Sequence, residues 1–166
     1  RIPKGQLLTP ENCMQYFVQK EVDAACIPQT ALQNPEQIKD MMPVFDIDEG
    51  VLLTTGMFIE KNEITAEMKN PVIAGVKAED LYQVAGGILR AGDRIHIYTV
   101  SESGETMPVW NDAFIQQVFD QTGNRILSDD TVTAAHRMNI YLDKEDVERF
   151  YAALAAGSLR IVEACD

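Results

Sequence analysis

Long apolar runs are missing from the 166-residue sequence. The most apolar stretches, at 72–76 and 152–156, fall far short of the roughly 20 residues that a membrane-spanning helix needs. No basic segment followed by an apolar segment is visible either, so the pattern of a secretory signal peptide is missing. Apolar residues still make up 46% of the chain, which is enough for a hydrophobic core. We therefore expect the printed sequence to fold as a soluble domain or as two small ones.

Positive charge is scarce. The sequence has 14 Lys and Arg against 26 Asp and Glu, for a net charge of −12. Such a field repels phosphate backbones and anionic headgroups, which disfavours nucleic acids and membrane surfaces as partners. The acidic residues are spread along the chain, as on a solvated surface, and a cationic partner is the alternative interpretation.

Cysteine is also rare. Cys13, Cys26 and Cys165 form neither a CxxC motif nor a cluster with histidine, so the spacing of a zinc site is missing. An odd number leaves at least one thiol unpaired. Cys13 and Cys26 are the pair nearest in sequence, and we hypothesise a disulfide between them.

Residue types that could act in catalysis do not form any known catalytic motif. His96 and His136 stand apart, without an HxxH pattern, and no nucleophile elbow, phosphate loop or dinucleotide fingerprint occurs. The neighbouring carboxylates at 46–49 and 129–130 lack the spacing of a calcium loop. The sequence thus predicts no catalytic, metal-binding or cofactor-binding residues, and a protein that binds rather than turns over a substrate.

An internal repeat marks the N-terminal third. Residues 2–9 and 47–54 share the pattern I-x-x-G-x-L-L-T. Gly5 and Gly50 can adopt positive φ without steric cost, as such a turn often requires. Each copy is expected to form a turn followed by a short apolar strand that ends at a threonine, Thr9 or Thr54. Two similar corners of one small, β-rich module with few helices are predicted.

The chain between and after the corners is punctuated by proline and glycine. Asn34 followed by Pro35 is typical of a helix start, and Pro43 limits that helix to about residue 40. Residues 60–70 are polar and lack periodicity, so we expect a linker there between a domain at 1–59 and another at 71–166.

The second domain is predicted to contain both strands and short helices. The expected elements are a strand at 71–76, helical turns at 78–84 broken by the glycines at 85–87, a turn at 89–94, a strand at 95–100 and a hairpin loop at 101–105. Residues 113–119 fit a helical stripe or one face of a strand, and periodicity alone does not decide between them. A type I turn is expected at 120–123.

The last helix has the clearest signals. Asp143 is the expected N-cap, Leu142 and Val147 stand at the positions of a hydrophobic staple, and Gly157 ends the helix. Its apolar stripe includes Phe150 and Tyr151 and predicts core packing. Strands are expected on both sides, at 138–142 and 159–163.

These motifs, in this order, resemble the CpaB/RcpC family, whose N-terminal part is a SAF (antifreeze-like, β-clip) domain. The corners at 2–12 and 46–54 are similar to the two signature corners of that domain. Residues 84–95 resemble the V-A-G-x-L-R-P-G-D-R-V stretch that follows it, although Ala91 replaces the usual proline and Gly87 interrupts the usual G-L-L. The motif positions that the resemblance marks as structural turns are Pro3, Gly5, Thr9, Gly50, Thr54, Gly86, Gly92, Asp93 and Arg94.

The resemblance implies a mostly β fold with short helices (α+β), in which a SAF/β-clip module precedes a small α+β domain. It favours a strand at 113–119. It also implies a non-enzymatic scaffold or binding module for assembly of Flp (Tad-type) pili. Such a protein lies outside the cytoplasm in the cell envelope, anchored by a membrane helix expected before Arg1. Its partners would be other pilus-assembly or envelope proteins, with self-association as a further possibility.

Two other functions fit the same resemblance. SAF domains accompany sugar-acid enzymes, so a module that binds carbohydrate or cell-wall glycan is one alternative. A chaperone of the flagellar P-ring type is the other, and it would bind a ring protein rather than pilus components.

Overall fold

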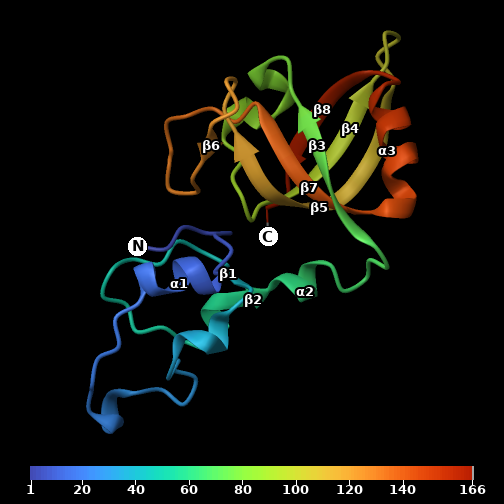
Figure 1. The fold of residues 1–166 in the computed structure, drawn as a ribbon. Coiled ribbons are helices and arrows are strands. Elements are labelled where there is room, and N and C mark those ends of the chain that lie inside the picture. Colours follow the sequence, from blue (N-terminus) through green and yellow to red (C-terminus); the bar gives the residue numbers. More distant parts are fainter. Residues whose placement is uncertain (166) are drawn as a thin grey trace. The chain divides into compact units, whose positions relative to one another are not determined.

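The computed structural model describes residues 1–165, which form a mostly β protein with short helices. The chain divides into two compact units, Arg1–Ile64 and Thr65–Asp166. This division falls inside the polar segment at 60–70, of which residues 61–64 form the short helix α2 (Lys61–Ile64). The α+β class expected from the sequence is therefore found (Figure 1).

The C-terminal unit is built on one antiparallel sheet with the strand order β3-β7-β5-β4-β8, to which β6 adds by pairing with β5. The strands are β3 (Pro71–Lys77), β4 (Arg94–Val100), β5 (Thr106–Phe119), β6 (Arg125–Ile126), β7 (Arg137–Asp143) and β8 (Ser158–Glu163). Figure 1 shows the sheet curling around its own core, with helix α3 (Val147–Leu154) alongside.

Alternation of the side chains positions the core of this unit. In β4, Ile95, Ile97 and Thr99 are buried while their neighbours are half-buried, as the period of two in a strand requires. Phe150 of α3 is 1% exposed and meets the Trp110 ring edge-on. The register between β4 and β5 shifts near Ile97, where the long strand β5 bends.

The expectations for this unit are largely confirmed. Strands occur at 71–76, 95–100, 138–142 and 159–163, and the ambiguous segment 113–119 is part of β5. The helical turns expected at 78–84 are reduced to one 3-10 turn, η4 (Leu81–Gln83), which the Asp80 carboxylate caps. A second turn, η5 (Ala85–Gly87), follows at once.

The last helix starts later than the sequence indicates. Asp143 accepts a hydrogen bond from the Glu145 amide and caps a 3-10 turn, η6 (Lys144–Asp146), which leads into α3. Its apolar stripe is only partly core, because Tyr151 keeps 43% of its surface exposed while Phe150 is buried. The Tyr151 hydroxyl instead bonds to the backbone of Gly75.

The N-terminal unit is much less regular, and the expectation of a β-rich module with few helices is wrong for it. Its only named strands are β1 (Met41–Pro43) and β2 (Phe58–Glu60), which pair with each other. Around them lie α1 (Pro10–Tyr16), η1 (Ala24–Cys26), η2 (Pro35–Ile38) and η3 (Thr55–Met57). The small core consists of Ile2, Leu8, Cys13, Ile38, Ile47 and Phe58.

The two repeated corners meet in this unit. Ile2 and Ile47, which occupy the same position in the two copies, form an isolated antiparallel bridge. Gly5 and Gly50 adopt φ of 69° and 85°, as predicted. The short strands expected after them do not form. Thr9 and Thr54 instead stand at the N-caps of α1 and η3, and each corner leads into a helical turn.

The helix start at Asn34 is confirmed, although only as the 3-10 turn η2. The hypothesised disulfide is wrong, because Cys13, Cys26 and Cys165 are all free. Cys13 is buried in the core of the N-terminal unit, and this burial raises the pKa of its thiol. Cys26 lies on the exposed chain beyond α1. Among residues 1–165 no helix is both long enough and apolar enough to cross a membrane.

Candidate binding groove in the N-terminal unit

A long exposed segment leaves the small core after α1. All thirteen residues from Val18 to Thr30, here called the arm, are exposed. The arm is held at both ends. Phe17 packs against the core before it, and after it the Leu32 amide donates to the Leu53 carbonyl at 2.9 Å. The arm itself contains the 3-10 turn η1 and ends in a second turn at 29–30.

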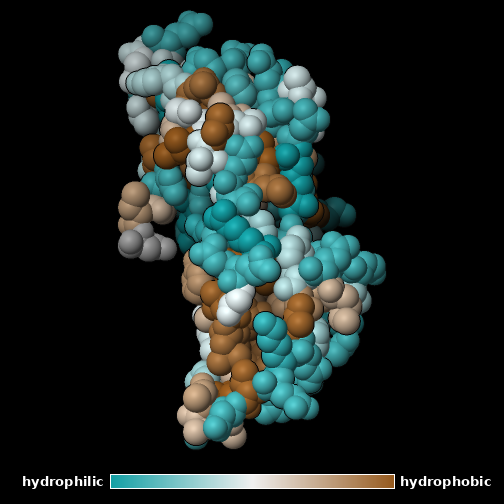
Figure 2. All heavy atoms as spheres, turned by 90° about the vertical axis from the view of Figure 1, so that its left-hand side faces the viewer, coloured by the Kyte–Doolittle hydropathy of each residue, from teal (hydrophilic) through white to brown (hydrophobic). Residues whose placement is uncertain are grey.

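Residues of the arm line a groove together with the second corner, residues 47–53, and with the chain before and after the arm, at 15–17, 31–35 and 38. The groove has a volume of about 1040 Å³. Large apolar side chains line it and keep much of their surface exposed: Val18 (80%), Val22 (52%), Ile27 (39%), Val51 (44%) and Leu52 (44%). Figure 2 shows a band of apolar residues over this unit. Apolar surface concentrated in a groove commonly marks an interaction site.

Charged side chains lie in the groove and along the arm. The charged residues that line the groove are Asp48, Glu49, Arg1 and Lys20, and Glu21 and Asp23 are exposed on the arm. The surroundings of the groove are thus more negative than positive, in keeping with the charge of the whole chain.

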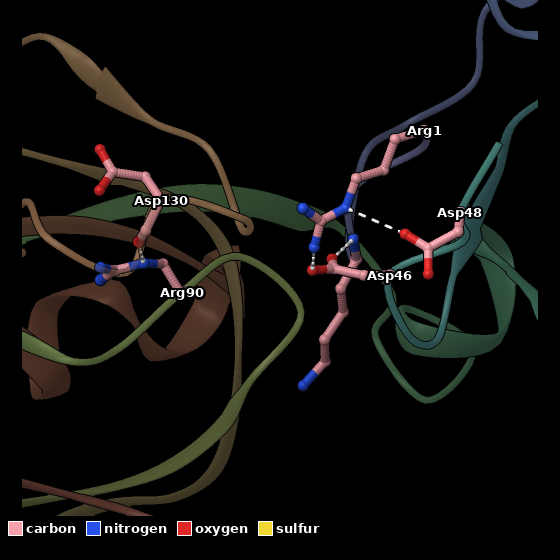
Figure 3. Close-up of polar contacts among 6 residues, drawn as sticks. Arg1, Asp46, Asp48, Arg90 and Asp130 are labelled. Carbon is pink, nitrogen blue, oxygen red and sulfur yellow. Dashed lines mark hydrogen bonds and ion pairs between the residues drawn. The ribbon is translucent and has the colours of Figure 1, made fainter.

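Arg1 ties the two corners together beside the groove. Its guanidinium donates to the Asp46 carboxylate at 2.7 Å and lies 3.7 Å from Asp48. The other oxygen of Asp46 accepts from the Lys4 amide at 2.7 Å (Figure 3). Asp46 therefore holds the chain on either side of Pro3, and one of the carboxylates noted in the sequence has a structural role.

The motif positions expected to act as turns lie in two separate groups. Pro3, Gly5, Thr9, Gly50 and Thr54 belong to the N-terminal unit, and Gly86, Gly92, Asp93 and Arg94 belong to the C-terminal unit. The first group surrounds the paired corners, and only Gly50 among them lines the groove.

The second group shapes the entry to β4. Gly92 has φ of 90°, and its amide donates to the Ile115 carbonyl at 2.9 Å. The Asp93 carboxylate is buried and accepts from the Arg90 amide at 2.6 Å. Arg94 forms an ion pair with Asp112 at 2.7 Å, next to the bend of β5. Gly86 adopts φ of 72° inside η5. These contacts stabilise the turn that leads into β4, which is a structural role.

Sequence reasoning missed Arg90. Its guanidinium donates to four backbone carbonyls, those of Gly87, Leu89, Asp130 and Thr133. Figure 3 shows Arg90 directed at the backbone of Asp130. The loop at 127–135 is thereby fixed to the turn before β4. No local pattern predicts this role, because two of its acceptors, the carbonyls of Asp130 and Thr133, are 40 and 43 positions away in the sequence.

The histidines and carboxylates occupy structural positions where contacts are defined. His96 Nδ1 accepts from the Asp112 amide at 3.2 Å, beside the bend of β5. The Asp130 carboxylate accepts from the amides of Val132 and Thr133. Among residues 1–165, no three His, Cys, Asp or Glu side chains gather as a metal site would need.

Both edges of the sheet in the C-terminal unit are partly covered. On β3 the Tyr151 hydroxyl bonds to the amide and carbonyl of Gly75, and on β8 Ile161 bridges to Val84. An uncovered strand edge is a common docking surface. Since these edges are occupied near their centres, the groove of the N-terminal unit is the better candidate.

Comparison with known proteins returns no match to a family model, to a curated protein or to a solved structure.

Proposed function

We propose that this chain is a non-enzymatic, extracytoplasmic component of Flp (Tad-type) pilus assembly, which acts as a scaffold or binding module. The observation that carries the proposal is the pairing of Ile2 with Ile47. The motifs similar to the two SAF signature corners are not scattered but support each other as one substructure. A β-clip module would need such an arrangement, and the positive φ at Gly5 and Gly50 is in keeping with it.

The distribution of exposed apolar surface supports a binding role. A module that only spaces its neighbours needs no apolar groove, whereas one that docks a protein does. The groove beside the second corner offers such a surface. The partner is then another protein of the pilus-assembly machinery or of the cell envelope.

Deletion of the gene in its host tests this proposal. We expect loss of surface pili, measured by electron microscopy and by the amount of pilin sheared from cells, while the intracellular pilin level is maintained. The intact gene supplied in trans should restore the pili. Fractionation should place the protein outside the cytoplasm.

Two results would contradict the proposal. Unchanged piliation in the deletion strain would exclude a role in pilus assembly. Loss of flagellar rings with normal pili would favour the alternative of a P-ring-type chaperone.

A further inference from the structure

The arm is difficult to explain by folding alone. Loops of more than about 12–15 residues with little secondary structure are uncommon in compact domains and are usually functional or disordered. The arm contributes no buried residue, yet it carries Val18, Val22 and Ile27 on its surface. These apolar side chains would gain free energy only if a partner covered them.

The chain at the start of the arm has no hydrogen-bonded neighbour. Phe17, the residue just before the arm, has extended dihedrals of φ −117° and ψ 139°, and residues 18–22 belong to no helix or turn. Among residues 1–165, no backbone hydrogen bond joins residues 17–22 to another segment. Such a stretch can receive an added strand, whose main chain supplies affinity while alternate side chains enter the groove.

The charge around the groove indicates the charge of that strand. Asp48 and Glu49 line the groove and Glu21 is exposed on the arm, while Arg1 is paired with Asp46 and lies 3.7 Å from Asp48. Basic side chains on the outward face of a bound strand would meet these carboxylates. The N-terminal unit as a whole has ten acidic and five basic residues, which favours a basic partner further.

We infer that the groove between the arm and residues 47–53 binds an extended segment of a partner protein, with apolar side chains on one face and lysine or arginine on the other. This inference rests on the proposed function, because it names the kind of partner segment that the scaffold holds. Val22 of the arm and Leu52 of the second corner both line the groove and would contact the apolar face.

Binding of defined peptides to the purified full chain tests the inference. The probe is a fluorescent decapeptide of alternating Val and Lys, compared with Ser/Lys and Val/Glu decapeptides by fluorescence anisotropy. The Val/Lys peptide should bind, and added salt should weaken it because exposed charges are screened. Equal binding of the Ser/Lys peptide would reduce the interaction to charge alone and overturn the inference, as would no binding of the Val/Lys peptide.

Single substitutions locate the site. Val22→Asp and Leu52→Asp should each weaken the Val/Lys peptide by about tenfold or more, since each removes one buried apolar contact. Both positions are exposed, so the fold should survive, and circular dichroism checks this. The matched control is Val132→Asp in the C-terminal unit, where the side chain is 92% exposed, and it should leave binding unchanged. Unchanged binding by both groove variants would overturn the inference.

Failure of this inference can be distinguished from failure of the proposed function. If deletion of the gene abolishes pili but Val22→Asp and Leu52→Asp restore them fully, the scaffold role stands and the groove is not its docking site. If deletion leaves pili intact, the proposed function fails whether or not the Val/Lys peptide binds. Sedimentation with purified peptidoglycan supplies a further outcome, because binding that both groove variants abolish would assign the groove to glycan instead.

Discussion

Ile2 and Ile47 form a closed antiparallel pair, in which each amide donates to the other's carbonyl at 2.8 and 2.9 Å. Their side chains are 3% and 2% exposed and share one small core. Because the two residues begin the two copies of the repeated motif, each corner is held in place by the other. The N-terminal unit has little regular structure besides, so its stability should depend strongly on this pair.

Replacement of Ile47 by alanine should lower the free energy of unfolding of the N-terminal unit by about 2–5 kcal/mol, through lost burial and a residual cavity. The buried Cys13 thiol reports on this unit, because unfolding exposes it to thiol reagents. We expect Cys13 to react faster in the variant, after the exposed Cys26 and Cys165 have reacted. Trp110 fluorescence reports on the C-terminal unit independently.

The control for this substitution is Val51→Ala in the same corner. Val51 is 44% exposed, and its truncation should leave Cys13 protected. Protection of Cys13 in the Ile47→Ala variant equal to that in the natural protein would show that the paired corners do not support the core.

Tyr151 covers the edge of the sheet at β3. Its hydroxyl donates to the Gly75 carbonyl at 3.0 Å and accepts from the Gly75 amide at 3.1 Å. Replacement by phenylalanine removes both hydrogen bonds and should cost about 0.5–1.5 kcal/mol for each of them. It should also speed hydrogen exchange of the Gly75 amide, measured by nuclear magnetic resonance.

Tyr82→Phe is the matched control, because Tyr82 is 77% exposed and its ring contacts Arg160 through its face. The Tyr82→Phe substitution also removes a phenolic hydroxyl, but it leaves the edge of β3 covered by Tyr151. If the Gly75 amide exchanges at the same rate in the Tyr151→Phe variant as in the natural protein, Tyr151 does not protect the edge.

The ionisation of Asp130 should make the stability of the fold depend on pH in the acid range. The Thr133 hydroxyl and the amides of Thr133 and Val132 bond to its carboxylate and lower its pKa to about 2. A depressed folded-state pKa means that the carboxylate stabilises the fold above its unfolded pKa of about 4, and that this contribution is lost as pH falls toward about 2. Thr133→Val should raise the pKa and flatten this part of the stability profile.

Melting temperatures between about pH 5 and pH 2 measure the effect of Thr133 on the titration of Asp130. Thr133→Ser keeps the hydroxyl and should retain the natural profile. Parallel profiles for the Thr133→Val variant and the natural protein would show that the hydroxyl does not set the titration of Asp130.

Local signals in the sequence were sufficient where one element carried its own pattern. The β-branched and aromatic residues at 95–100 and the cap at Asp143 predict β4 and the last helical segment, because such preferences act within a few residues. The segment 113–119 was ambiguous, since its apolar residues fit either period. Its pairing with Ile140 and its neighbours in β7 decides the matter, and that partner is distant in sequence.

The N-terminal unit shows the limit of the same reasoning. Apolar residues after Gly5 and Gly50 favour strands, but a strand needs a neighbour along its length, and here only single bridges form. Helix α1 was missed although Thr9 and Pro10 are an N-cap and a first helical residue, the same signals that identified η2. The groove could not be predicted, because the segments that line it are separated in sequence and the exposure of the arm depends on the tertiary structure.

The last prediction contrasts two kinds of residue. Gly92 has φ of 90°, and a valine there should cost about 1–3 kcal/mol of stability, because a β-branched side chain rarely adopts positive φ. Piliation should fall with stability in this variant. His96→Ala and His136→Ala should remain folded and keep piliation near the level of the natural protein, since the His96 side chain accepts a single exposed hydrogen bond, from the Asp112 amide, among residues 1–165.

Measurement of the melting temperature and of piliation in the same strains separates the two explanations. Gly56→Val is the comparison for Gly92→Val, because Gly56 is exposed, has no positive φ and leaves open space around a new Cβ. Its effect on piliation should be small. A histidine variant that melts like the natural protein yet assembles no pili would reverse the conclusion, because a folded but inactive protein implies that the imidazole takes part in chemistry or in metal binding.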